Sequence, residues 1–307
     1  MVTAQSVKEL KDLTGCGMMD CKNALQETGG DIDKAVKFLR EKGLSKAAKK
    51  AGRIAAEGLV SCMIDESKKI GVIVEINSET DFAAKSDKFR EFVTLIAKTI
   101  IDNDVKDVEA LKEIKASGTN EKVADVLTEK IATIGENIQI RRFAKLTGDG
   151  LFSYVHNDGG TGFGTHATLV KLTASDYGDD VKECAKGVLL HITAMAPEFI
   201  SSDAVPKDAV DAERETQLNI INKENEAKPK PQNVVEKILE GRMKKYFEET
   251  CLMTQSFVKD PDVTVEKYLT NVSKDVKIVE FVRFEKGEGI AKKEENFADE
   301  VASMMNG

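Results

Sequence analysis

Two stretches of this chain repeat one pattern of two strands followed by a helix. The segment GLVSCMI (58–64) is echoed by GLFSYVH (150–156), and the strand VIVEINSETD is echoed by ATLVKLTASDYGDD. An amphipathic helix is predicted after each second strand, from about Asp87 to Ile101 and over DDVKECAKGVLLHITAM. A period of about 90 residues in only two copies is too long for a solenoid. The repeat therefore predicts two related subdomains, each a small antiparallel sheet backed by helices.

The predicted fold class is α+β, with this duplicated core at its centre. We expect the first core subdomain to cover 58–148 and the second to cover 149–205 plus 249–289. A third strand for each sheet is expected from residues 137–148 and 276–289.

The segment inserted at 206–248 is predicted to form a protruding helical hairpin. Charged helices over 206–226 and 231–248 are separated by AKPKPQ, where two prolines enforce a break. The apolar stripe is thin, which predicts either a short antiparallel coiled coil or a surface that needs a partner. Its members are Val210, Leu218, Ile221, Val235, Ile238, Leu239 and Met243.

Residues 1–43 show three short helical periods. The first is predicted to begin at Ser6, with Glu9 completing a capping box, and the third to end at Gly43. A bundle this small buries little apolar surface, and it resembles ubiquitin-associated three-helix domains, so we expect a docking module. A basic helical linker (44–57) is predicted to follow, and a C-terminal helical module to occupy 290–307.

The charge distribution and the hydropathy exclude several classes of protein. The net charge is −8, and a chain this acidic does not bind nucleic acid through a broad basic face. The basic cluster at Lys46, Lys49, Lys50 and Arg53 is expected to be a solvated helix face. There is no apolar run long enough for a transmembrane helix and no signal-peptide pattern at the N-terminus, so no membrane association and a cytoplasmic location are expected.

The sequence offers no convergent reactive groups. The five cysteines are scattered without a C-x-x-C pair and are expected to be reduced, so we predict no metal and no cofactor. His156 and His166 flank NDGGTGFG, which is predicted to be a flexible hairpin turn, not a phosphate cradle. His191 lies on an apolar helix and is expected to be a satisfied core or interface residue. Without a P-loop, G-x-S-x-G or H-E-x-x-H motif, the chain is predicted to be a multi-domain binding protein and not an enzyme.

One junction poses a specific question. The strand GVIVEINSETD meets the helix FREFVTLIAKTI through SETDFAAKSDKF, where Ser78, Thr80 and Asp81 suit a helix cap but Phe82 does not. By pattern alone, Phe82 staples the helix by packing inward. The alternative is that Phe82 points outward as a preformed contact for a partner.

Five blocks in order along the chain resemble the bacterial elongation factor Ts family. They are VKELKDLTGCGMMDCKNALQETGGDIDKAVKFLREKG, INSETDFAAKSDKF, HITAMAPEFI, EGRMKKYFEE and VRFEKGEGI. The resemblance runs from about Val7 to Ala302 and implies a guanine-nucleotide exchange factor for elongation factor Tu, the GTPase that delivers aminoacyl-tRNA to the ribosome. It implies the same architecture as the pattern does.

The resemblance also implies site residues. Thr80, Asp81, Phe82 and Ala83 match the family's TDFV loop, which is inserted into the GTPase near its magnesium site, although Ala83 stands where the family has Val. Further contacts with the GTPase are implied for Lys8, Met18, Met19, Lys22 and His156. One of the two methionines is alternatively expected to fill the core of the small domain.

Two other interpretations remain open at this point. The first domain alone would suit a ubiquitin-associated-like adaptor without exchange activity, and an enzyme whose site is not evident is a second alternative. The resemblance also leaves two assemblies open, one factor with one GTPase or a dimer of such pairs.

Overall fold

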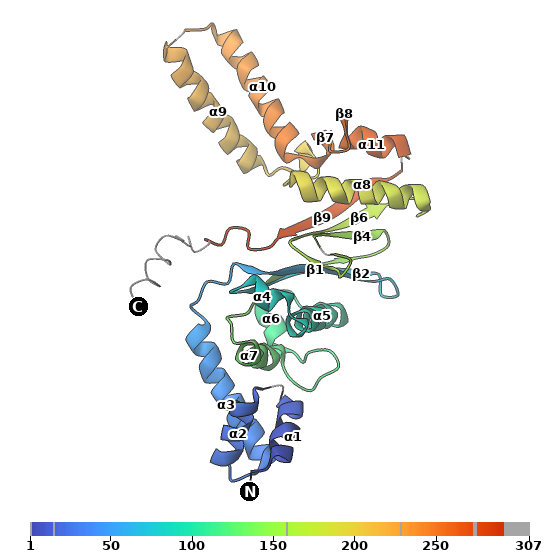
Figure 1. The fold of residues 1–307 in the computed structure, drawn as a ribbon. Coiled ribbons are helices and arrows are strands. Elements are labelled where there is room, and N and C mark those ends of the chain that lie inside the picture. Colours follow the sequence, from blue (N-terminus) through green and yellow to red (C-terminus); the bar gives the residue numbers. More distant parts are fainter. Residues whose placement is uncertain (1, 15, 158, 228, 273–274, 292–307) are drawn as a thin grey trace.

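Two β-sheets lie face to face at the centre of the molecule, and helices cover the outer face of each sheet (Figure 1). The computed structural model describes residues 2–14, 16–157, 159–227, 229–272 and 275–291. The first sheet has the order β3-β2-β1-β5 and the second has the order β4-β6-β9, with all neighbours antiparallel. The strands are β1 (Glu57–Asp65), β2 (Ile70–Ser78), β3 (Gln139–Thr147), β4 (Leu151–His156), β5 (Phe163–Gly164), β6 (His166–Thr173) and β9 (Lys277–Glu285).

The predicted duplication is visible in the topology. The order β3-β2-β1 matches β9-β6-β4, and a long helix follows the second strand of each half, α5 (Asp87–Asp102) after β2 and α8 (Asp179–Met195) after β6. The two third strands lie where the sequence predicts them.

The glycine-rich turn after β4 connects β4 to β6 as a hairpin, as predicted, with His156 opposite His166, but part of it forms the additional strand β5. Its strand β5 crosses to the other subdomain and pairs with β1, with Val60 opposite Gly164. The Ser61 hydroxyl also donates a 2.8 Å hydrogen bond to the Gly162 carbonyl. A Cβ atom on Gly164 would lie 2.0 Å from the His156 carbonyl oxygen, so only glycine fits there. The turn therefore joins the two sheets.

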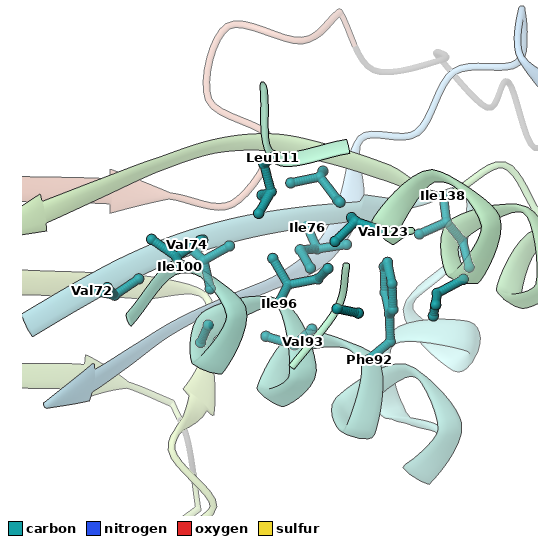
Figure 2. Close-up of a cluster of buried hydrophobic side chains, with 14 of the residues drawn as sticks. Val72, Val74, Ile76, Phe92, Val93, Ile96, Ile100, Leu111, Val123 and Ile138 are labelled. Carbon is teal, nitrogen blue, oxygen red and sulfur yellow. The ribbon is translucent and has the colours of Figure 1, made fainter. Parts of the chain in front are cut away.

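Strand β2 is buried on both faces because it lies in the middle of this layered arrangement. Val72, Val74 and Ile76 point to the helices α5 and α7 (Val123–Ile134), as Figure 2 shows. Ile73, at an alternate position, packs with residues of the second sheet, including Leu169. The short helices α4 (Asp81–Lys85) and α6 (Val108–Glu113) complete this subdomain.

A buried carboxylate links the first sheet to the turn that follows β9. Glu75 on β2 is fully buried and accepts hydrogen bonds from Arg141 (2.9 Å), Arg142 (2.6 Å) and the Asn77 amide (3.1 Å). The backbone N–H of Gly287, beyond β9, donates a further bond of 2.7 Å. Gly287 has φ +71, and a Cβ there would meet the Ala56 carbonyl oxygen at 2.3 Å. The turn after β9 thus closes on the other subdomain.

The three N-terminal helices form their own small core, but two predicted boundaries are wrong. The helices are α1 (Ala4–Thr14), α2 (Met18–Glu27) and α3 (Ile32–Lys50). The first cap is Thr3, because Thr3 and Ser6 exchange backbone-to-hydroxyl bonds of 3.0 and 3.1 Å, so Ser6 lies inside the helix. Helix α3 does not end at Gly43; a Cβ there would lie 3.4 Å from that of Ala132 on α7, so the small residue serves a close helix contact. The segment expected to link the domains is therefore helical as far as Lys50, and α3 itself carries the connection.

The basic cluster near the end of α3 is not simply a solvated face. Lys46 pairs with Asp20 at 3.1 Å, Arg53 pairs with Glu79 at 3.4 Å, and the Lys50 ammonium donates to the Gly135 carbonyl. These contacts hold α3 against its own domain and against the first core subdomain.

The predicted helical hairpin projects from the far end of the molecule (Figure 1). It consists of α9 (Lys207–Ala227) and α10 (Gln232–Thr250), with short 3₁₀ turns η1 (Ser202–Ala204) and η2 (Leu252–Thr254) near its base. Most of the predicted stripe packs between the two helices, but Leu218 is 36% exposed and does not belong to it. The hairpin base adjoins β7 (Ser256–Phe257), β8 (Asp260–Thr264) and α11 (Val265–Val272).

His191 on α8 is a satisfied core residue, as predicted. Its ring is fully buried, its Nε2 lies 2.9 Å from Gln255 Oε1, and its Nδ1 accepts a 3.1 Å bond from the Val258 N–H. Within the described part of the chain no helix is long and apolar enough to cross a membrane. The predicted C-terminal module lies, apart from Ile290 and Ala291, outside the described residues.

Candidate functional site

The Asp81-Phe82 pair forms the start of α4, a helix of only five residues between β2 and α5. Figure 1 shows α4 at the edge of the first subdomain, near the segment that leads from α3 into β1. Thr80 is the N-cap, with an extended backbone, and its hydroxyl accepts a 3.2 Å hydrogen bond from the Ala83 N–H. Ser86 ends this helix and caps the next one, because its hydroxyl bonds to the Ala83 carbonyl and accepts from the Phe89 N–H.

Phe82 points away from the protein. It is 82% exposed, more than any other large apolar side chain in the described structure, whereas Ala83 and Ala84 beside it are 7% and 2% exposed. The inward staple is therefore wrong: the two alanines anchor the helix and the phenyl ring is left free. An exposed aromatic ring on a well-anchored helix is suited to insertion into a partner.

The Asp81 carboxylate next to this ring is paired mainly with Lys85. The Lys85 ammonium lies 2.6 Å from the Asp81 carboxylate, one helical turn on, and 5.9 Å from the centroid of the Phe82 ring. This hydrogen bond holds the pKa of Asp81 below its usual range, with a smaller contribution from the positive charge of Lys286. Asp81 is thus an ionised hydrogen-bond acceptor beside the exposed phenyl ring.

A second loop supports the start of α4. Both Glu136 carboxylate oxygens accept from Thr80, one from its N–H at 2.9 Å and the other from its hydroxyl at 2.6 Å. In return, Glu79 accepts from the Asn137 N–H at 2.6 Å. The sequence gives no local signal for this support, since the partners are more than 50 residues apart.

The other implied contacts lie elsewhere. Met18 and Met19 open α2 and are 60% and 64% exposed, so neither fills the small core. Lys8 and Lys22 are exposed on the same three-helix domain, and so is Leu13 of α1, at 65%. The four predicted residues are therefore all exposed on the N-terminal domain, which is separate in sequence from α4.

His156 lies at the end of β4, on the second sheet. It is exposed, its Nδ1 lies 3.0 Å from the Tyr154 hydroxyl, and its ring centroid is 6.0 Å from that of His166. Burial lowers the pKa of His166, which lies 3.5 Å from Glu285. Among the described residues, no group of three or more His, Cys, Asp or Glu side chains is placed to hold a metal ion.

Comparison with known proteins assigns the chain to a family. The family model described as Elongation factor TS matches residues 79–288, a range that begins at the Asp-Phe junction and ends at the turn that closes on Glu75. The match lies outside the three-helix domain, so a ubiquitin-associated-like adaptor is not favoured.

Two curated relatives are similar over their full length. Elongation factor Ts of Clostridium novyi is 49% identical, with the alignment covering 100% of this chain and 99% of the relative. Elongation factor Ts of Clostridium kluyveri is 47% identical, covering 100% of both chains. The chain belongs to the elongation factor Ts family of translation elongation factors.

Proposed function

We propose that this protein promotes GDP release from elongation factor Tu by inserting Asp81 and Phe82 near the Mg²⁺ site of that GTPase, which allows GTP to rebind. The observation that carries the proposal is the outward Phe82 ring on a helix whose other apolar side chains are buried. The Phe82 ring, which we call the wedge, is already held in place when the protein folds, so little conformational entropy is lost on binding. No covalent step is required.

The wedge acts by displacing the elements that hold Mg²⁺ and the β-phosphate. Since the ion offsets the phosphate charge, its loss weakens nucleotide binding. The ionised Asp81 adds a hydrogen-bond acceptor or a repulsive charge nearby. By thermodynamic reciprocity, bound GDP weakens the affinity of the factor for the GTPase by the same ratio.

The magnitudes are compatible with this mechanism. A thousandfold change in nucleotide affinity corresponds to roughly 4 kcal/mol. Full burial of a phenylalanine side chain contributes about 1.5–3 kcal/mol, and Phe82 keeps most of that contribution for a partner because it is 82% exposed. The wedge therefore supplies a large share, and the loss of metal ligation supplies the remainder.

The test is stopped-flow release of a fluorescent GDP analogue from elongation factor Tu at saturating factor. We expect Phe82→Ala to slow release by about tenfold or more, from the burial free energy above. The same change should alter the free energy of unfolding by only about 0.5 kcal/mol, because only a fifth of the ring is buried. A matched control is Ile220→Ala, which removes a 40% exposed apolar side chain from α9.

Each outcome has a clear meaning. Slow release at saturating Phe82→Ala, with weaker but still measurable binding of nucleotide-free elongation factor Tu, supports the wedge. Equal rates for the wild type, Phe82→Ala and Ile220→Ala would refute it and leave the other contacts responsible. No acceleration by the wild type would refute exchange activity itself.

A further inference from the structure

We propose that Glu136 is a positioning residue for Asp81 and Phe82: its carboxylate fixes the first turn of α4 and so aims the phenyl ring. The inference rests on the proposed function, which gives these two side chains their role. Glu136 belongs to the loop that follows α7, and no feature of the local sequence marks it as part of the site.

The contact is made at two points on one residue. The Glu136 carboxylate accepts from the Thr80 N–H (2.9 Å) and from the Thr80 hydroxyl (2.6 Å), so it fixes both the backbone and the side chain. Hydrogen bonds to an ionised acceptor are shorter and stronger than those between neutral groups. A two-point contact also fixes an orientation, which a single bond does not.

The direction of the hydroxyl proton matters for the cap. The Thr80 hydroxyl oxygen has one proton, which it donates to the Glu136 carboxylate. The lone pairs of that oxygen are therefore left to accept from the Ala83 N–H at 3.2 Å, which is the bond that starts α4. Removal of Glu136 would let the hydroxyl rotate and weaken the cap.

Such a short helix needs this support. A helix of one turn is unfavourable by itself, because ordering its first residues is repaid by few hydrogen bonds. Helix α4 has five residues, and only Ala83 and Ala84 of them bury apolar surface well. Besides these two alanines, its position therefore depends on its two ends, Thr80 and Ser86.

The supporting loop is itself held on both sides. Asn137 donates its N–H to Glu79 (2.6 Å) and its side-chain amide to the Arg53 carbonyl (2.7 Å). Since Thr80 donates to Glu136 in turn, hydrogen bonds run in both directions between the end of β2 and this loop. Gly135 ends α7 in a left-handed conformation (φ +88), and its carbonyl accepts from Lys50 of α3. Glu136 thus reaches Thr80 from a loop fixed before and after it.

The experiment compares Glu136→Ala and Glu136→Gln with Glu91→Gln, which alters an exposed carboxylate on α5. Amide hydrogen exchange in the free protein should quicken at Ala83 and Ala84 by about tenfold or more in the Ala variant, the change expected from losing a charge-assisted hydrogen bond. The Gln variant keeps one acceptor oxygen and should show a smaller change. Amides of β2 should be unaffected in all three variants.

Release of the fluorescent GDP analogue provides the second measurement. Glu136→Ala should slow release at saturating factor, and it should add much less in a Phe82→Ala background, where only the positioning of Asp81 remains to be lost. Unchanged exchange at Ala83 and Ala84, or equal slowing with and without Phe82, would overturn the inference. If Phe82→Ala alone has no effect on release while hydrogen exchange still quickens, the proposed function fails and the positioning contact stands.

Discussion

Replacement of the buried Glu75 by alanine should destabilise the whole core. The change removes the acceptor of four hydrogen bonds, two from arginines and two from amide groups, in a place that water does not reach. Arg141 and Arg142 would lose the carboxylate that balances their charge, and the Gly287 N–H would lose its only described acceptor.

The magnitude follows from these losses. Breaking a buried ion pair by removing one partner costs about 3–5 kcal/mol, and a buried N–H without an acceptor costs about 1–3 kcal/mol. The arginines are partly exposed and keep other partners, which reduces the cost of the broken ion pairs. We therefore expect a total loss of about 4 kcal/mol, less than the sum of the two upper values. For a domain of this size, about 2–4 °C of Tm is lost per kcal/mol, which gives about 8–16 °C.

Thermal unfolding followed by far-ultraviolet circular dichroism measures this loss directly. Glu280→Ala is the matched control, since Glu280 is an exposed carboxylate on β9. A Tm shift for Glu75→Ala no larger than that of the control, or below about 3 °C, would refute the view that this carboxylate locks the two subdomains together.

Two further predictions concern His191 and the N-terminal domain. Burial lowers the pKa of His191 in the folded state below the unfolded value of about 6.5. The neutral ring therefore stabilises the fold fully above a pH of about 6.5. This stabilisation is lost as the pH falls from about 6.5 through the folded pKa, by at most about 1.4 kcal/mol per pH unit. Chemical unfolding of the wild type and of His191→Asn between pH 7 and 5 should show the steeper loss in the wild type, and parallel curves would contradict the assignment of that slope to His191. Met18→Ala with Met19→Ala should raise the factor concentration needed for half-maximal GDP release by about tenfold, as expected for exposed apolar anchors, with the maximal rate retained. An unchanged half-maximal concentration would show that this surface does not dock on the GTPase.

Local patterns predicted much of this fold because the periodicity of each element survives packing. The strand ending at Ser78, the helix from Asp87 and the hairpin helices all follow from alternation, caps and prolines. The duplicated order of the sheets follows from the sequence repeat. Where a close contact decides the structure, the pattern fails: Gly43 looks like a helix end but is a contact point for Ala132.

The candidate site was only partly predictable for the same reason. The capping role of Thr80 can be predicted from the adjacent residues. Whether Phe82 points in or out depends on Ala83 and Ala84, which fill the space beneath the helix. Glu136 is 56 residues away from Thr80 in sequence, so no window of local sequence contains both. The pairing of β5 with β1 likewise joins segments about 100 residues apart.

The pairing of β6 with β9 sets the order in which the protein can be completed during synthesis. The strands β1, β2 and β3 leave the ribosome within one stretch of chain, so these three strands of the first sheet can pair early. In the second sheet, His166 pairs with Glu285, and α8, the hairpin and α11 must all be synthesised in between. Until β9 has been synthesised, one edge of β6 is open to pairing with the wrong strand. Glu75 also lacks its hydrogen bond from the Gly287 N–H until then. Of the described strands, β9 is therefore the last to emerge, and it closes the second sheet and adds a further link to the first.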